Sequence, residues 1–213
     1  MSGILIIGAG GHAKVVADIL FLQGETVLGY VDDDPSSWGT VRLGLPVLGK
    51  IDDFEQHSPG GLVMGIGDNA VRRSIVMRLG ERAAGMWRSA IHPRATVAAS
   101  VQLGVGAVIL AHAVVNPDSI IGDHVIINTG ATVDHDCRIG SFCHVAPGVH
   151  LAGGTKLGEG VFVGVGASAI PGRVIGHWAI VGAGAVVINN IPDHVTAIGI
   201  PARWDDPQAK RNR

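Results

Sequence analysis

Aromatic side chains, cysteines and long apolar runs are all scarce in this sequence. Phenylalanine, tyrosine and tryptophan make up 4% of its 213 residues, so large rings do not build the interior. Its two cysteines, Cys137 and Cys143, form no disulfide framework and fit a reducing cytoplasm. No apolar run approaches about 18 residues, and the N-terminal stretch lacks a basic segment followed by an apolar one. We therefore expect a cytoplasmic protein with no membrane span and no secretory signal.

An excess of charge is missing as well, since 16 basic and 18 acidic residues leave a formal net charge of −2. The sequence therefore has no excess of basic residues of the kind that nucleic-acid-binding proteins carry. Glycine is abundant, with 32 residues, and 47% of the chain is apolar, which is enough for a sizeable core and excludes a disordered chain. Glycine does not recur at every third position, so the chain is not collagen-like, and another kind of repeat is needed to explain it.

The second half of the chain repeats every six residues. From Ile91 to Val187, sixteen of the seventeen residues at this spacing are Ile, Leu or Val. The position four residues further on is small or β-branched, with Arg173 as the large exception. Neither a helix nor an ordinary strand has this period, whereas a parallel β-helix does. Cys137 and Cys143 fall at the small, inward position, so we expect them to be buried rather than nucleophiles or metal ligands.

A longer period of 18 residues, three hexapeptides, predicts one triangular coil and about five coils in all. Five glycines recur at this spacing directly after a large aliphatic residue: Gly104, Gly122, Gly140, Gly158 and Gly176. We expect them at a corner where the backbone takes a conformation that costs glycine little. The narrow interior holds one large aliphatic and one small side chain per side, which explains the scarcity of rings.

Residues 91 to 203, including the closing run Gly199-Ile200-Pro201-Ala202-Arg203, resemble the β-helix of the hexapeptide acyltransferases. The resemblance implies a left-handed coil, which the six-residue period alone does not give. It also implies a homotrimer and an acyl-CoA or acyl-carrier-protein donor.

The first half reads as a small α/β domain. An apolar strand at 4–8 leads into the loop Gly8-Ala9-Gly10-Gly11-His12-Ala13-Lys14 and a helix at 13–23 that Gly24 ends. Further strands are expected at 27–31, 45–48 and 62–66, and helices at 52–57 and 70–79. The predicted fold is therefore mainly β, with a Rossmann-like parallel-sheet domain at 1–88, a left-handed parallel β-helix at 89–203 and a polar tail at 204–213. For the tail we expect a disordered end.

Three interpretations of the glycine loop remain open: a site for a nucleotide-sugar diphosphate, a dinucleotide redox site and a merely structural strand–turn–helix. Asp32 lies 24 residues beyond Gly8, where it would hold a ribose. However, the domain is about half of a doubly wound fold, so the second mononucleotide half is missing. A glycine loop at a helix N-terminus still suits any pyrophosphate, which favours the nucleotide-sugar.

The loop G-x-G-G-H-A-K joined to a hexapeptide helix is similar to the nucleotide-sugar N-acetyltransferases. Members of that family acetylate the 4-amino group of a UDP-linked sugar of the bacillosamine pathway or act on GDP-perosamine, and relatives O-acetylate sialic acid. The resemblance implies that Gly10, Gly11 and His12 lie along the diphosphate-sugar. It also implies that Asp32 and Asp33 lie at the base and ribose.

Most of the ten histidines are predicted at turns or on the surface: His57, His92, His112, His124, His150, His177 and His194. For His112 and His150, lining a cleft is the alternative. Residues 128–144 are different, because they gather His135, Asp136 and His144 within a few hexapeptides. Four interpretations compete here: a solvated corner, a metal site, a proton sensor and a general base. Two histidines and an aspartate suit zinc. His135 and His144, however, are half a coil apart and so lie on different faces of one subunit.

The resembled family favours the general base, since its motif N-x-x-x-x-x-[ED]-H-[ED] with a second histidine nine residues later fits this segment. It implies that His135 takes the proton of the attacking amine and that Asp136 orients the ring, chemistry that suits an imidazole with a pKa near 6.5. Gly153, one coil beyond His135, is the implied amide donor to the oxyanion. We expect no metal and no covalent acyl-enzyme.

The resemblance also assigns the coenzyme site. It places His144 beside the acetyl end of acetyl-CoA, and Asn128 at the sugar or acceptor amine, although Asn128 serves equally well as a turn residue. The coenzyme arm is expected in a groove between two subunits, along Gly164, Val165, Gly166, Ala167, Gly182, Ala183 and Gly184.

The resemblance, together with these patterns, implies an acetyl-CoA-dependent N-acetyltransferase that acts on the amino group, at C4, of a UDP- or GDP-linked amino-deoxy sugar for surface glycans. An O-acetyltransferase of the sialic acid type is the alternative among enzymes, because one histidine base serves both acceptors. A non-catalytic or zinc-dependent hexapeptide-repeat protein is the alternative from another class.

Overall fold

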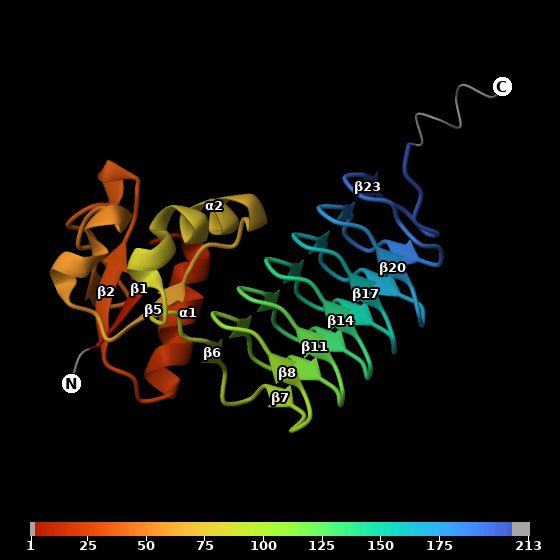
Figure 1. The fold of residues 1–213 in the computed structure, drawn as a ribbon, viewed down its shortest axis with the longest axis horizontal. Helices are drawn as coiled ribbons and strands as arrows, with labels where there is room; N and C mark the ends of the chain where they lie inside the picture. The colour runs from red at the N-terminus through yellow and green to blue at the C-terminus, as the bar shows by residue number, and fades with distance from the viewer. Residues whose placement is uncertain (1–2, 206–213) are drawn as a thin grey trace.

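The N-terminal part of the molecule is a small α/β domain (Figure 1). A computed structural model describes residues 3–205. The domain is built on a three-stranded parallel sheet in the order β2-β1-β5. Its elements are β1 (Ile4–Ile7), α1 (Gly11–Leu22), β2 (Val27–Val31), the 3-10 helix η1 (Pro35–Ser37), β3 (Val41–Arg42), β4 (Leu45–Pro46), the 3-10 helix η2 (Ile51–His57), β5 (Gly61–Met64), α2 (Asn69–Leu79) and the 3-10 helix η3 (Gly80–Ala83).

The two main helices begin for different local reasons. Asp68 accepts a hydrogen bond from the backbone N–H of Val71 at 2.8 Å and so caps the N-terminus of α2. The N-cap of α1 is Gly10, which has no side chain to bond the first-turn amides. The helix starts at Gly11, two residues before the predicted start. No side chain caps the amides of its first turn.

The C-terminal part is a parallel β-helix whose coils stack one after another along a single axis (Figure 1). Its two-residue strands form three sheets, which we name after their first strands. The β6 sheet holds β6 (Ala90–Ile91), β9 (Val108–Ile109), β12 (Ile126–Ile127), β15 (His144–Val145), β18 (Phe162–Val163), β21 (Ile180–Val181) and β23 (Thr196–Ala197). The β7 sheet holds β7 (Thr96–Val97), β10 (Val114–Val115), β13 (Thr132–Val133), β16 (His150–Leu151), β19 (Ser168–Ala169) and β22 (Val186–Val187). The β8 sheet holds β8 (Gln102–Leu103), β11 (Ile120–Ile121), β14 (Arg138–Ile139), β17 (Lys156–Leu157) and β20 (Val174–Ile175).

The register of the β-helix agrees with the 18-residue period. Val115 pairs with Val133 and Ile121 with Ile139, each partner being one coil away. The aliphatic residues of the repeat and both cysteines form one buried core inside the coil. About six turns are present rather than the predicted five, because the coil continues past Val187, the last counted residue of the repeat, to β23.

The five glycines that recur every 18 residues, which we call the glycine column, follow the strands of the β8 sheet at one corner of the coil. The structure gives a different reason for them from the one predicted. Gly104, Gly122, Gly140, Gly158 and Gly176 do not have positive φ angles. They are small because the next coil comes too close: a Cβ at Gly140 would lie 2.7 Å from the carbonyl carbon of Gly158, and one at Gly158 2.6 Å from the nitrogen of His177. Steric stacking of the coils, not backbone freedom, therefore selects glycine at this position.

The left-handed residue of this corner stands two places further on. In successive coils it is Gly106, His124, Phe142, Gly160 and Trp178, with φ between 53° and 70°. The prediction that His124 is a surface residue is wrong, since it is 3% exposed. Its ring stacks on Phe142 with centroids 5.5 Å apart and meets Trp87 edge-on at 4.8 Å. Burial lowers its pKa to about 4.

The α/β domain sits against the first coils of the β-helix. The buried face of α1, which includes Ala13, Val16 and Ala17, belongs to the same apolar cluster as Val108 and Ile126 of the β6 sheet. At the other end, Trp204 packs against the last part of the helix core, although we predicted it as the first residue of a polar tail. The remainder of that tail, 206–213, lies outside the described residues. Across residues 3–205 we find no helix of the length and apolar character needed to cross a membrane.

Candidate active site

The glycine loop between β1 and α1 presents an open backbone surface. A Cβ placed on Gly10 or on Gly11 would meet no atom within 4 Å. Gly8 is different, since its φ of +97° and the nearby Ile66 side chain both require glycine. Because no side chain caps α1, its first-turn amides and helix dipole face this open space and favour an anion there.

The two aspartates after β2 have different partners. Asp32 holds the glycine loop, because its Oδ2 accepts a hydrogen bond from the N–H of Ala9 at 2.6 Å and its Oδ1 accepts one from Asp34 at 2.9 Å. Asp33 instead forms an ion pair with Arg78 of α2 at 2.7 Å. Asp32 therefore lies at the predicted loop, whereas Asp33 is tied to the second helix.

Three of the predicted residues, His12, Asn128 and His144, come together where the α/β domain meets the β6 sheet. The rings of His12 and His144 have centroids 6.3 Å apart. Within the described chain, Nε2 of His12 is buried with no hydrogen-bond partner. Its pKa is lowered to about 4, first by burial and then by the charges of His144 and Arg72. We call these three residues the His144 group.

The ring of His144 is held from both sides. Its Nδ1 lies 3.1 Å from the carbonyl oxygen of Gly67, which only accepts, so Nδ1 carries the proton. Its Nε2 lies 3.0 Å from Nδ2 of Asn128 and accepts a hydrogen bond from that amide. Burial lowers the pKa of His144 to about 4, against the opposing effect of the Gly67 carbonyl. The ring is thus neutral and fixed in one tautomer.

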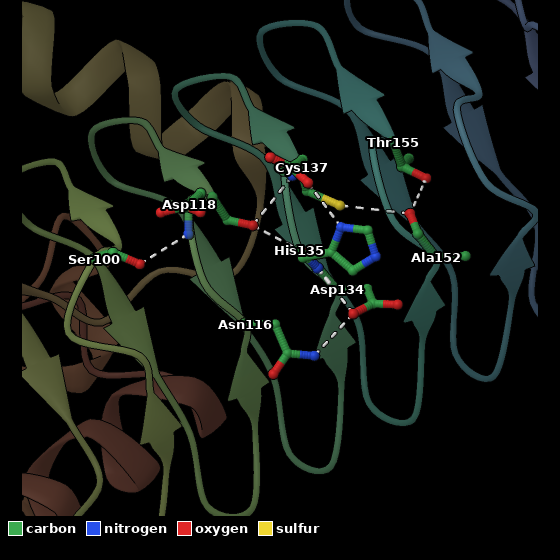
Figure 2. A network of polar contacts seen from close by, with 10 residues as sticks. Ser100, Asn116, Asp118, Asp134, His135, Cys137, Ala152 and Thr155 are labelled. Atoms are coloured by element: carbon green, nitrogen blue, oxygen red, sulfur yellow. Dashed lines mark hydrogen bonds and ion pairs between the residues drawn. The ribbon is translucent and has the colours of Figure 1, made fainter.

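The second group lies at the corner between the β7 and β8 sheets (Figure 2). Nδ1 of His135 is 2.7 Å from Oδ2 of Asp136, and since a carboxylate only accepts, Nδ1 donates. This bond and the nearby Asp134 charge raise the pKa of His135. The side chain is 61% exposed, so Nε2 is left as a lone-pair acceptor on an open surface. We call His135, Asp136, Asp134 and Gly153 the His135 group.

Asp134 and Gly153 form the surroundings of that ring. Asp134 accepts hydrogen bonds from the N–H of His135 at 2.8 Å and from the Asn116 amide at 2.9 Å (Figure 2). These bonds lower its pKa, with a smaller contribution from the N–H of Gly153. A Cβ at Gly153 would lie 2.7 Å from Cε1 and Nε2 of His135. A side chain at this position would therefore require the imidazole to move from its observed place.

Each group borders its own cavity. One of about 560 Å³ lies over the β7 sheet beside Asp134 and is also lined by His150, for which a cleft was the alternative to a turn or solvent position. One of about 620 Å³ lies between the start of α2 and the β6 sheet and is lined by His144, Phe162 and Trp178. As the half-coil spacing predicts, one chain carries the two histidines on different faces.

The corner between the β6 and β7 sheets forms a strip with few side chains. It carries the residues expected along the coenzyme arm. Gly166 and Gly184 stand at the left-handed position with nothing within 4 Å of a Cβ, while Gly164 and Gly182 touch the next coil or strand. Val165 is 55% exposed between them. An extended ligand can approach this backbone closely.

Known proteins share both halves of the chain. The model described as the PglD N-terminal domain matches residues 3–79, and the model for bacterial transferase hexapeptide (six repeats) matches 118–153. PerB from Caulobacter crescentus, solved with CoA and GDP-perosamine, is 47% identical with a TM-score of 0.90, over 97% of this chain and 98% of that one. The acetyltransferase domain of PglB from Neisseria gonorrhoeae FA1090, solved with acetyl coenzyme A, is 39% identical with a TM-score of 0.86, over 95% and 98%.

This chain belongs to the hexapeptide-repeat N-acetyltransferase family. The UDP-N-acetylbacillosamine N-acetyltransferase of Bacillus subtilis (strain 168) is 40% identical over 119 residues, which is 52% of each chain. The chain spans between 24% and 52% of the curated relatives that it matches. Family membership confirms the predicted resemblance, the acyltransferase class and the fold, a small parallel-sheet α/β domain followed by a left-handed parallel β-helix. The predicted coenzyme, acetyl-CoA, is bound in the PglB structure, and PerB was solved with CoA.

The sequence interpretation of this N-acetyltransferase family member missed Arg72 and Asn69. Asn69 donates from Nδ2 to the carbonyls of Gly160 and Val161, each at 3.1 Å, and joins α2 to the β-helix. The available signal was the spacing of Asn69 and Arg72 with Ile75 and Leu79, which places them on one buried face of a helix. Because both residues are polar, a search for apolar residues at helical spacing did not include them.

A metal site was one of the interpretations of the histidine-rich segment. Among residues 3–205 there is no group of three or more His, Cys, Asp or Glu side chains placed to hold a metal ion. Both thiols are buried, and burial raises the pKa of Cys143 to about 12 and that of Cys137 above its ordinary value.

Proposed function

We propose that this protein transfers the acetyl group of acetyl-CoA to the C4 amino group of a nucleotide-linked amino-deoxy sugar, with His135 as the general base. The observation that carries the proposal is the orientation of this imidazole. Nδ1–H of His135 donates a hydrogen bond to Asp136, and Nε2 is left without its proton on an open surface. An outward lone pair, rather than a buried one, is what an incoming amine requires.

The transfer moves one proton in two steps, from the amine to His135 and from His135 to the leaving thiolate. The neutral amine attacks the thioester carbonyl carbon, and its lone pair forms the C–N bond while the carbonyl electrons move to oxygen. Nε2 of His135 accepts the proton that the nitrogen loses, and Asp136 stabilises the resulting imidazolium. The C–S bond then breaks, and the proton on His135 passes to the departing CoA thiolate.

We assign stabilisation of the tetrahedral oxyanion to the backbone N–H of Gly153. The glycine lies directly under the His135 ring, where no Cβ fits. This N–H also interacts with the Asp134 carboxylate, so the oxyanion replaces part of that interaction during the reaction. A donor that is already oriented toward negative charge costs little reorganisation.

The glycine loop is the proposed site of the sugar diphosphate. Support comes from the uncapped N-terminus of α1 and from the open space at Gly10 and Gly11. The buried Nε2 of His12 lies next to this loop and has no partner in the described chain. In the proposal it bonds the diphosphate-sugar, and Asp32 and Asp33 lie near the ribose and base.

Acetyl-CoA is proposed to lie along the strip formed by residues 164–167 and 182–184, in a groove between two subunits of a homotrimer. The separation of the His135 and His144 groups within one chain supports this arrangement. One subunit then supplies His135 and Gly153, and its neighbour supplies His144 and Asn128. The proposal includes a cytoplasmic enzyme that serves surface-glycan synthesis.

A panel of UDP-, GDP- and CMP-linked amino sugars with acetyl-CoA tests the function, with release of free thiol as the signal and the product mass as confirmation. GDP-perosamine is tried first because PerB, the relative solved with it, is 47% identical over nearly the whole chain. We expect thiol release and a mass gain of one acetyl group with a 4-amino sugar. Acetylation of hydroxyl sugars such as sialic acid, with none of the amino sugars, would contradict the proposal.

A further inference from the structure

Arg72 of α2 is a buried cation that the proposed chemistry does not use. Its side chain is 1% exposed, the largest of the fully buried side chains. Ion pairs in the described chain join other arginines to carboxylates, at Arg73, Arg78 and Arg82, but not this one. Burial lowers its pKa to about 10, so it stays charged at neutral pH. A buried guanidinium without a carboxylate needs neutral acceptors around it.

Those acceptors come from both parts of the molecule. Nε donates to the carbonyl of His124 at 2.8 Å, and Nη2 donates to that of Phe142 at 2.8 Å and to that of Cys143 at 3.2 Å. Nη2 also donates to Oδ1 of Asn69 at 3.0 Å, while Nη1 donates to the carbonyls of Ile66 at 3.2 Å and Gly67 at 3.0 Å. One side chain thus joins the loop before α2 to two successive coils.

One of these acceptors is shared with the candidate site. The carbonyl oxygen of Gly67 accepts one hydrogen bond from Nη1 of Arg72 and another from Nδ1 of His144. His144 in turn accepts from Nδ2 of Asn128, and Oδ1 of Asn128 accepts from the N–H of Thr129. A continuous chain of hydrogen bonds therefore runs from Arg72 to Asn128 and fixes the direction of each member.

The charge of Arg72 acts on the same rings. It faces His12 from α1, His144 from β15 and His124 from the preceding coil, and it disfavours protonation of all three. Asp68 and Cys143 are the other ionisable groups that interact with Arg72. Burial contributes more than Arg72 to the low pKa of each histidine, but only the hydrogen bonds select the tautomer.

We propose that Arg72 is a positioning residue for the acetyl-transfer site: through the Gly67 carbonyl it holds His144 with its proton on Nδ1, so that Nε2 receives and orients the Asn128 amide. The proposal rests on the proposed function for its kinetic consequence. The state of the His144 ring is independent of that function and is measured without any substrate.

The chain provides a matched control. Arg73, the next residue of α2, also bridges to the β-helix, through Glu159 at 2.9 Å, but its side chain is 47% exposed. Arg72→Lys keeps the charge and loses the planar fork that reaches several carbonyls. Arg73→Lys makes the same chemical change at a bridge that does not touch His144.

The experiment is ¹⁵N nuclear magnetic resonance of histidine-labelled wild type, Arg72→Lys and Arg73→Lys, with the His144 signal identified by its loss in His144→Gln. We expect wild-type His144 to carry its proton on Nδ1 and to stay neutral down to about pH 5. In Arg72→Lys the Nδ1-protonated form should be partly lost, and kcat/KM should fall about ten- to hundredfold, as for a displaced site group. Arg73→Lys should change neither.

Two results would overturn the proposal. One is a wild-type His144 ring that carries its proton on Nε2, which decides the question even if Arg72→Lys does not fold. The other is a folded Arg72→Lys protein whose His144 signals match the wild type. If no nucleotide sugar is acetylated, the proposed function fails, while the signals still decide the role of Arg72.

Discussion

Among single residues, Asp136 stands at a backbone position that ordinarily favours glycine. Its φ is +59°, and the next two coils have Gly154 and Gly172 at the same corner position. A non-glycine residue in this conformation costs about 1 kcal/mol, although aspartate tolerates it better than most. Asp136 offsets that cost with a 2.7 Å bond to His135. The conformation aims the carboxylate back at the ring that precedes it.

Replacing Asp136 by asparagine should lower kcat and shift the pH profile. The base acts in its neutral form, so kcat/KM falls as the pH drops through the pKa of His135. That pKa is raised by Asp136 and Asp134, which places the acid limb of the wild type above pH 6.5. In Asp136→Asn the limb should move to lower pH because the imidazolium loses its hydrogen-bonded carboxylate. Rates measured from pH 5 to 9 check this.

The control is Asp118→Asn, which changes the same left-handed corner one coil earlier without touching the ring. Its profile should match the wild type. An unchanged acid limb in Asp136→Asn would show that His135 does not set the pH dependence.

The family resemblance pointed to the residues of the His135 group but not to all those around His144. His135 and Asp136 are neighbours in the sequence, and the 18-residue period was enough to place Gly153 beside the His135 ring. Arg72 and the burial of His124 depend on how α2 docks onto coils more than fifty residues away. A hexapeptide pattern carries no information on that contact.

Among structural elements, the corner after each β8-sheet strand shows how the coils stack. Its first residue needs glycine because the next coil lies within 3 Å of a Cβ, as at Gly140. Its third residue needs a left-handed backbone, which non-glycine residues such as Phe142 also adopt. The sequence pattern predicted the position of the glycines, but it could not separate close approach from backbone freedom, because glycine satisfies both.

Gly140→Ala should therefore destabilise the β-helix by about 1–3 kcal/mol, the range for overpacking. Its Cβ would meet backbone atoms of Gly158 and Glu159 that cannot rotate away. The matched control is Gly130→Asn, at a left-handed corner with nothing within 4 Å, where asparagine is tolerated. Thermal unfolding of both variants checks this. Equal melting temperatures would refute steric stacking as the reason for the glycine column.

For the whole molecule, the central feature is that one chain carries the His135 group and the His144 group in two separate places. The His144 group lies at the junction of the α/β domain with the β6 sheet, and the His135 group lies at the corner between the β7 and β8 sheets. Half-coil spacing predicted this separation. It could not predict that the α/β domain closes over His144, since the path of the chain between the two parts has no repeat to follow.

A mixture of two inactive variants should recover activity if neighbouring subunits complete each site. His135→Ala lacks the base and His144→Gln lacks the opposite wall. In trimers assembled from equal amounts, about one quarter of the interfaces pair an intact His135 with an intact His144. Co-expressed protein should then exceed both parents in acetyl transfer. Activity no higher than in the parents would mean that each chain forms its site alone.

The most direct test of the account is the rate of acetyl transfer by His135→Ala with the amino sugar that the wild type accepts. We predict a kcat at least about 10²-fold lower, the range for a lost general base, with circular dichroism and melting temperature unchanged. The side chain is exposed and its removal opens no core cavity, so folding should be preserved. A folded His135→Ala protein with the wild-type kcat would contradict the central claim that His135 takes the proton of the acceptor amine.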